Sequence, residues 1–152
     1  MIKKVLLTLV VLLVVAQFFR SEKNLGVTGG PNDITVKYAV PAPVKDLLQR
    51  ACYDCHSNRT HYPWYAEIQP VGWWLAKHVT DGKNNLNFSE FGKYPVKRAV
   101  TRLEQISEDV SEKAMPLPSY RWGHPDARLS AEEIKLLTNW AESLHDEIAP
   151  DQ

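Results

Sequence analysis

Cysteine and methionine are scarce in this chain of 152 residues, with two of each. Two cysteines in a single motif cannot form the set of crosslinks that holds a disulfide-rich domain together. The alternation of polar and apolar residues that marks a half-buried strand does not extend over any length of the chain. These absences leave an all-α domain with a hydrophobic core as the predicted fold class.

An excess of charge of either sign is also missing, because 18 basic side chains face 18 acidic ones. Residues 1–20 contain three basic side chains and no acid, so the rest of the chain has 15 basic and 18 acidic side chains. A protein that binds nucleic acid needs a clustered basic face. The mildly acidic body therefore predicts that nucleic acid is not a partner.

Both cysteines lie in one short motif, Cys52-Tyr53-Asp54-Cys55-His56. The spacing C-x-x-C-H is the attachment signature of a c-type haem. On a helical turn the two sulfurs lie on one face, where each can form a thioether with one vinyl group, and the next residue offers its imidazole to the iron. The motif predicts one covalently attached haem c per chain, held by Cys52 and Cys55, with His56 as an iron ligand.

Other uses of the two cysteines fit the sequence less well. A disulfide between Cys52 and Cys55 would close a very short loop and remove little entropy from the unfolded chain. A thioredoxin-like redox pair needs a βαβ context, which is missing here. A zinc site built from Cys52, Cys55, His56 and His61 lacks a second cysteine pair.

The N-terminus carries an apolar run, in which Lys3 and Lys4 precede residues 5–19. A basic start before an apolar segment is typical of an export signal, and we favour an uncleaved anchor over residues 1–20. At about 1.5 Å per residue the run spans roughly 22 Å, so flanking residues must contribute to cross a hydrocarbon core of ~30 Å. The basic start predicts a body outside the cytoplasm, at the periplasmic face of the inner membrane.

The remainder divides into a linker and one domain. Residues 21–41 are polar and contain several glycines and prolines, which predicts a linker, and residues 42–148 form the predicted haem-binding domain. Apolar residues recur at helical spacing over 43–55, 70–82, 95–113 and 130–148. Gly82 is the expected C-cap of the second of these helices, and Ser130 with Glu133 forms a capping box for the last. The segments 57–69, 83–92 and 114–129 are expected to be irregular.

A second iron ligand is sought among thioether and imidazole side chains. Met115 lies in a loop stiffened by two prolines, and a thioether is a soft ligand for low-spin iron, although most methionines fill gaps in cores. His78, on the apolar face of the second predicted helix, is the alternative ligand. His61, His124 and an open sixth position are further alternatives.

Aromatic side chains near these segments are candidates for lining the cofactor pocket. Trp74 and Tyr120 are the two that we assign to cofactor binding, and Trp64 and Trp73 lie close to them in the sequence. The candidate partners of the haem propionates are Arg59, Lys77 and Arg121.

Beyond the motif, the sequence resembles the bacterial haem-binding domain family defined by C-x-x-C-H, over residues 30–148. The resemblance rests on the motif and on Pro63-Trp64-Tyr65, Pro70-Val71-Gly72-Trp73-Trp74, Leu86-Asn87-Phe88-Ser89, Met115-Pro116, His124-Pro125 and Leu129-Ser130. It implies a cytochrome c-like monohaem domain that is exported and often tethered to a membrane. It leaves open the sixth ligand and the physiological partner.

These features predict a one-electron carrier more than an enzyme, with a redox protein as its partner and the membrane contacted through residues 1–20. An iron bound by both His56 and Met115 has no free site for a substrate. Two alternatives keep the sixth position open or labile: a haem peroxidase or other oxidoreductase, and a haem-based gas sensor.

Overall fold

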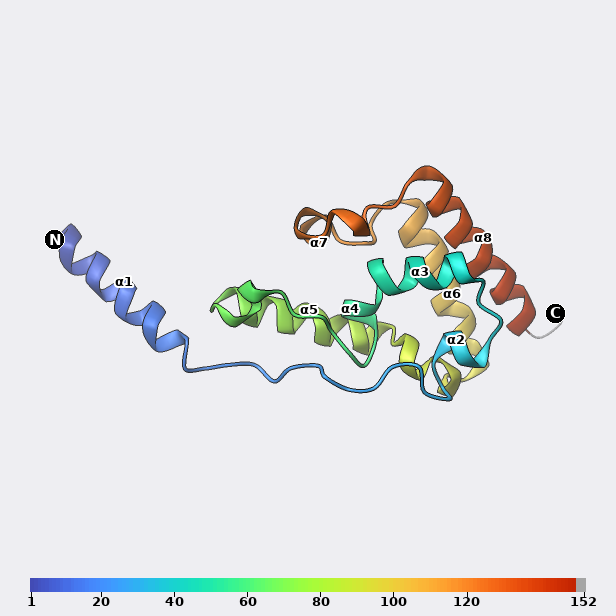
Figure 1. Ribbon diagram of the computed structural model, residues 1–152, viewed down its shortest axis with the longest axis horizontal. Coiled ribbons are helices and arrows are strands. Elements are labelled where there is room, and N and C mark those ends of the chain that lie inside the picture. The colour runs from blue at the N-terminus through green and yellow to red at the C-terminus, as the bar shows by residue number, and fades with distance from the viewer. Residues whose placement is uncertain (150–152) are drawn as a thin grey trace.

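The computed structural model describes residues 1–149 and consists of helices joined by loops (Figure 1). Its α-helices are α1 Ile2–Ala16, α2 Ile34–Lys37, α3 Ala42–Ala51, α4 Tyr53–His56, α5 Val71–Asn85, α6 Val96–Ser111, α7 Pro118–Gly123 and α8 Ala131–Ile148. Short 3-10 helices cover η1 Trp64–Glu67, η2 Phe88–Lys93 and η3 Pro125–Ala127. Residues 1–149 contain no strand, so the predicted all-α class is confirmed.

The core of the body forms where α6 and α8 pack along each other and α3 lies against α8 (Figure 1). Leu103 of α6 and Leu137 of α8 are both fully buried, and burying one such side chain stabilises a fold by about 1.5–3 kcal/mol. The capping box predicted from Ser130 and Glu133 is confirmed, and it starts α8. Among the elements of residues 1–149, α6 and α8 share the most extensive contact.

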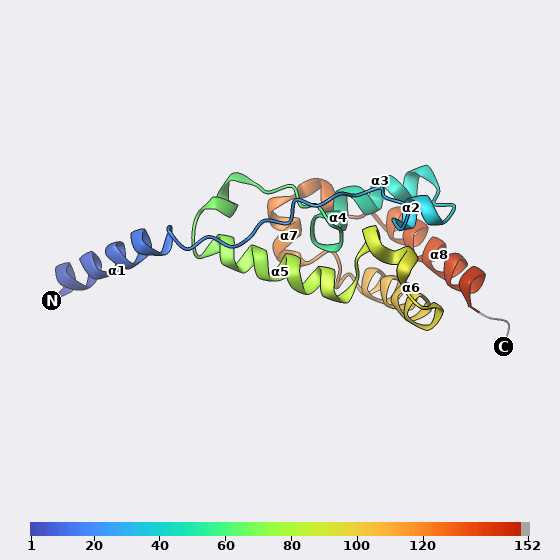
Figure 2. The same cartoon turned by 90° about the horizontal axis from the view of Figure 1, so that it is seen from below.

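At the N-terminus, α1 stands apart from the body, and the following segment continues beside α5 to α2 (Figures 1 and 2). No side chain of α1 is buried. Within residues 1–149, no helix has both the length and the apolar character needed to cross a membrane. The second half of the predicted linker lies on the body, since Asp33 caps α2 and Ile34 is fully buried in the core.

The helix predicted over 43–55 is interrupted at Cys52. The Cys52 amide donates to the Leu48 carbonyl and closes α3, whereas the Cys55 and His56 amides donate to the Cys52 carbonyl and form α4. Cys52 itself has φ −128° and lies outside both helices. The interruption separates the motif from the α3 axis and lets α4 pack on α5.

Gly82 does not cap the second predicted helix, because α5 continues to Asn85. A Cβ atom at Gly82 would lie 2.7 Å from the Cys55 carbonyl oxygen, closer than packed atoms allow. The C-cap prediction was wrong, because this glycine permits a close approach between α5 and the motif instead of a left-handed turn.

All three segments expected to be irregular contain short helices, and η1 is the one within residues 57–69. In residues 83–92, the Asn87 side chain accepts from the Ser89 amide and starts η2, which buries Phe88 and Phe91. In residues 114–129, Pro118 occupies the first turn of α7, where its missing N–H leaves no bond unmade. Side chains in residues 83–92 and 114–129 therefore project in part from helical backbone.

Candidate functional site

The motif lies against two adjoining cavities. One is lined by α6 residues and is called here the α6-side cavity; the other is lined by α5 residues and is called the α5-side cavity. They enclose about 600 Å³ and about 700 Å³ of space between atoms, counted to include the part open to solvent. The residues that line both are Ala51, Cys52, His56, Asn85, Met115 and Pro116. This shared lining joins the cavities into one site.

Both cysteines are free thiols that are half-buried beside the cavities. Burial raises the pKa of Cys52 to about 12, and the neighbouring Cys55 sulfur adds to the shift. Burial and the Asp54 carboxylate raise the pKa of Cys55 to about 11. Redox-active cysteine pairs have a lowered thiol pKa instead, so these two thiols stay protonated at neutral pH and do not resemble such a pair.

The His56 ring is held from one side by the end of α5. Its Nδ1 lies 3.1 Å from the Gly82 carbonyl oxygen and 3.1 Å from the Leu86 carbonyl oxygen. Burial lowers the pKa of His56, and the two carbonyls oppose that shift. Because Nδ1 must carry the proton to donate to a carbonyl, the other nitrogen, Nε2, keeps its lone pair free for a metal.

Met115 enters the site from the loop that follows α6. Lys113 turns the chain with φ 60°, a left-handed conformation common after the end of a helix. The Met115 amide then donates to the Asp109 carbonyl at 3.0 Å. With this support the Met115 side chain lines both cavities, as His56 does.

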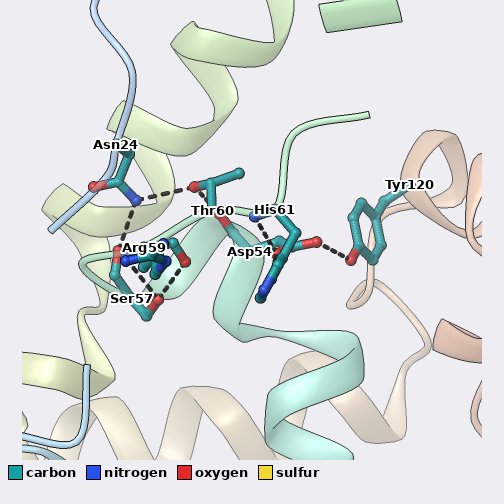
Figure 3. A network of polar contacts seen from close by, with 7 residues as sticks. All are labelled: Asn24, Asp54, Ser57, Arg59, Thr60, His61 and Tyr120. Carbon is teal, nitrogen blue, oxygen red and sulfur yellow. Dashed lines mark hydrogen bonds and ion pairs between the residues drawn. The ribbon is translucent and has the colours of Figure 1, made fainter. Parts of the chain in front are cut away.

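A polar network ties α7, the helix that follows the Met115 loop, to the motif (Figure 3). The Tyr120 hydroxyl donates to Asp54 Oδ2 at 2.7 Å, and the His61 amide donates to Asp54 Oδ1 at 2.9 Å. Burial and the Asp54 carboxylate raise the pKa of Tyr120, which keeps its proton on this bond. The network continues from the Asp54 carbonyl through Thr60 to Asn24.

Sequence reasoning missed Asp54, because it treated the two residues between the cysteines as a spacer. A carboxylate at this position is a signal that could have been used, since it is a strong acceptor beside an attachment motif. Tyr120, assigned to cofactor binding, does line the α5-side cavity. Its hydroxyl at the same time donates a hydrogen bond to Asp54 of the motif.

His78 lines the α5-side cavity but not the α6-side cavity. Its Nδ1 lies 2.8 Å from the Trp74 carbonyl oxygen, and its ring lies 4.2 Å from the Trp74 ring, centroid to centroid. Trp74 lines neither cavity and supports His78 instead. His61, with 89% of its side chain exposed, and His124 line neither cavity.

The remaining sequence candidates lie away from the cavities. Trp64 and Trp73 are 77% and 40% exposed and line neither cavity. The same holds for the basic side chains expected near the propionates, namely Arg59, Lys77 and Arg121. A basic residue that sequence reasoning missed, Arg102, lines the α6-side cavity. Arg102 lies among the apolar residues of the third predicted helix, and this position is the signal in the sequence that could have identified it.

The chemistry of the site fits a haem. Two free thiols, a histidine with its Nε2 available and a thioether all border a largely apolar space. Haem pockets combine such axial ligands with a surrounding of low polarity. A zinc site is less well supplied, since among residues 1–149 no three His, Cys, Asp or Glu side chains lie close enough together to hold a metal ion.

Comparison with known proteins agrees with this chemistry. A family model described as a haem-binding domain matches residues 11–143, which include the motif, α5, α6 and the Met115 loop. No curated protein and no solved structure matches the chain.

Proposed function

We propose, from the premise that this chain belongs to the haem-binding domain family, that it carries one covalently bound haem c and transfers single electrons outside the cytoplasm. The observation that carries the proposal is the shared cavity lining, in which the C-x-x-C-H motif and Met115 meet from distant parts of the sequence. Each step rests on residues of this chain.

Cys52 and Cys55 are the proposed attachment residues. Each thiol would add its sulfur to one carbon of a vinyl group and its hydrogen to the other, so the reaction consumes neither oxidant nor reductant. Both thiols are free and protonated and both line the α5-side cavity, which supports this step. Attachment at two points would keep the cofactor with an exported protein.

His56 is the proposed ligand on the attachment side. Its Nδ1 donates to the carbonyls of Gly82 and Leu86, and a second-sphere bond of this kind orients a ligating imidazole and increases its basicity. Since Gly82 of α5 and Leu86 directly after it supply the carbonyls, the C-terminal end of α5 would orient the ligand as well as forming a wall of the site.

Met115 is the proposed sixth ligand, with His78 as the alternative. Met115 lines both cavities together with His56, whereas His78 lines one. When bound, a haem with two protein ligands supplies a one-electron couple and no open site for a substrate, and a methionine ligand raises its reduction potential. These properties favour a carrier over an enzyme, with another redox protein as partner through a small and transient contact.

The N-terminal segment is the proposed membrane contact, with the body at the periplasmic face. Support comes from the basic start, the apolar α1 and its projection from the body (Figure 1). The α1 end is held to the body, since Gln17 Nε2 donates to the Gln69 carbonyl at 3.2 Å and Trp73 Nε1 donates to the Phe19 carbonyl at 2.6 Å. A tether of this kind would restrict how the body meets its partner.

A second candidate function keeps the sixth position labile, as in a haem peroxidase or a gas sensor. The observation in its favour is that His78 borders the same space as Met115. A histidine beside an open iron site can act as an acid–base group.

The test starts with covalent attachment. The full chain is produced in a host that matures c-type haem, and a denaturing gel is stained for haem. We expect a stained band for the native chain and none for Cys52→Ser with Cys55→Ser, because both sulfurs are then absent. A colourless native band would reject the proposal.

Optical spectra of Met115→Ala and His78→Ala then assign the sixth ligand. Oxidised native protein is expected to be low-spin with a sulfur-to-iron charge-transfer band, which Met115→Ala removes and His78→Ala keeps. If the low-spin spectrum is lost in His78→Ala and kept in Met115→Ala, His78 is the sixth ligand instead. A high-spin native spectrum with rapid carbon monoxide binding would favour the second candidate.

A further inference from the structure

Arg102 is unusual among the residues around the site. Of the residues within 1–149 that line the two cavities, it is the only arginine or lysine. It reaches the α6-side cavity from α6, on the same helical face as Gln105, Ile106, Asp109 and Val110. A lone basic side chain in a largely apolar cavity requires a reason.

The hydrogen bonds of Arg102 are incomplete. Its Nη1 donates to the Gln105 side-chain oxygen, but its Nε is buried and has no hydrogen-bond partner. Within residues 1–149 Arg102 also makes no ion pair, although Asp109 lines the same cavity. A buried donor without an acceptor keeps the full cost of its desolvation, and this cost is larger for a charged group. The cavity therefore lacks an acceptor that Arg102 needs.

We propose that Arg102, positioned by Gln105, binds a propionate carboxylate of the haem. This inference rests on the proposed function, because it requires haem in these cavities. A guanidinium offers planar N–H groups that match both oxygens of a carboxylate. A propionate would give the Arg102 Nε its acceptor and would itself gain a cation within the apolar site.

Other groups facing this cavity carry no competing positive charge. The motif contributes Cys52 and His56, α6 contributes Asp109, and α5 contributes the neutral Asn85. The Asp109 carboxylate would repel a propionate in this cavity, so a propionate there needs a neighbouring cation. The ordinary propionate candidates Arg59, Lys77 and Arg121 line neither cavity.

Two variants of α6 arginines test the inference in the full holoprotein. Arg102→Gln removes the cavity cation, and the matched control Arg98→Gln removes a cation from the same helix that is exposed and lies over the Tyr94 ring. The midpoint potential is measured across pH to find the apparent pKa of the haem-linked propionate, and resonance Raman spectra follow the propionate bending band. Haem staining checks that the cofactor is attached in each protein.

Arg102→Gln is expected to raise the propionate pKa by one unit or more, a tenfold increase in its proton affinity, because an adjacent positive charge favours a carboxylate. The bending band shifts as well, while Arg98→Gln changes neither. Equal behaviour of the two variants, with haem attached, would overturn the inference and leave the proposed function intact. A native chain without haem would reject the proposed function instead.

A further variant tests the inference if Arg102→Gln does not acquire haem. Arg102→Lys keeps the charge but loses the planar pair of donors, so its bending band is expected to shift while its propionate pKa rises by less than one unit. An Arg102→Lys protein with the native band position would overturn the inference.

Discussion

The hydrogen bond between Tyr120 and Asp54 joins α7, which follows the Met115 loop, to the C-x-x-C-H motif. If Met115 is the sixth ligand, as proposed, removal of this bond should make that ligand labile. Tyr120→Phe deletes the hydroxyl and leaves the ring. The bond is 2.7 Å long and its acceptor is a carboxylate; hydrogen bonds to charged groups contribute about 1.5–3 kcal/mol. Because Tyr120 is only half-buried, water compensates in part, and we expect a loss of about 1–2 kcal/mol.

If that energy holds the loop closed, its loss increases the population with the loop open by roughly 5–30-fold, since 1.4 kcal/mol corresponds to a factor of ten. Carbon monoxide binds reduced haem only when the sixth position is free. The rate of carbon monoxide binding to the reduced protein, followed by stopped-flow absorbance, should therefore rise by the same factor in Tyr120→Phe.

The matched control is Tyr62→Phe. Tyr62 is also half-buried, and its hydroxyl accepts from the Asn24 amide at 2.8 Å, away from the Met115 loop. This variant should lose stability in urea unfolding but bind carbon monoxide at the native rate. Equal rates in native protein and Tyr120→Phe, with a loss of stability in the latter, would show that the bond stabilises the fold without holding the ligand loop.

Further predictions concern the packing around the site. Gly82→Ala should cost about 1–3 kcal/mol and reduce haem attachment, because its Cβ would meet the Cys55 carbonyl at 2.7 Å; Gly30→Ala, where nothing lies within 4 Å, is the control for urea unfolding and haem staining. Leu103→Ala should lower the free energy of unfolding by about 2–5 kcal/mol, since it leaves a cavity between α6 and α8, whereas the 39% exposed Leu136 should tolerate alanine with a smaller loss. The carboxylates of Asp146 in α8 and Glu104 in α6 raise the pKa of His145. The contribution of protonated His145 to the stability of the fold is therefore complete below its unfolded pKa of about 6.5, and it is lost as pH rises through the higher folded value. That contribution should stay under about 1 kcal/mol because the partners Glu104 and Asp146 are exposed to solvent. His145→Gln should remove the corresponding pH dependence of unfolding; an unchanged dependence would contradict the assignment.

Local patterns of the sequence were sufficient for the helical class. The all-α class, the helix predicted over 95–113 and found at Val96–Ser111, and the capping box at Ser130 are confirmed. Helical spacing and capping act between residues a few positions apart. The haem-binding assignment is shown by the family match, and the five-residue motif already indicated it.

The tertiary structure decided what depends on residues far apart in the sequence. Gly82 was misread as a cap because its effect is on the Cys55 backbone, 27 positions away. Asp54, bonded to Tyr120 66 positions later, and Arg102, facing the motif from α6, had no local pattern that revealed their neighbours.

By itself, then, the sequence determined the helical class and indicated haem binding, since spacing along one turn sets which groups share a face. The three-dimensional packing decided which side chains meet across the cavities. His56 and Met115 line both of them, His78 lines one, and Arg102 is the basic side chain among the lining residues of 1–149. The reason is physical: a short-range pattern records the turn on which a residue lies, whereas a shared cavity depends on how separate helices pack against one another.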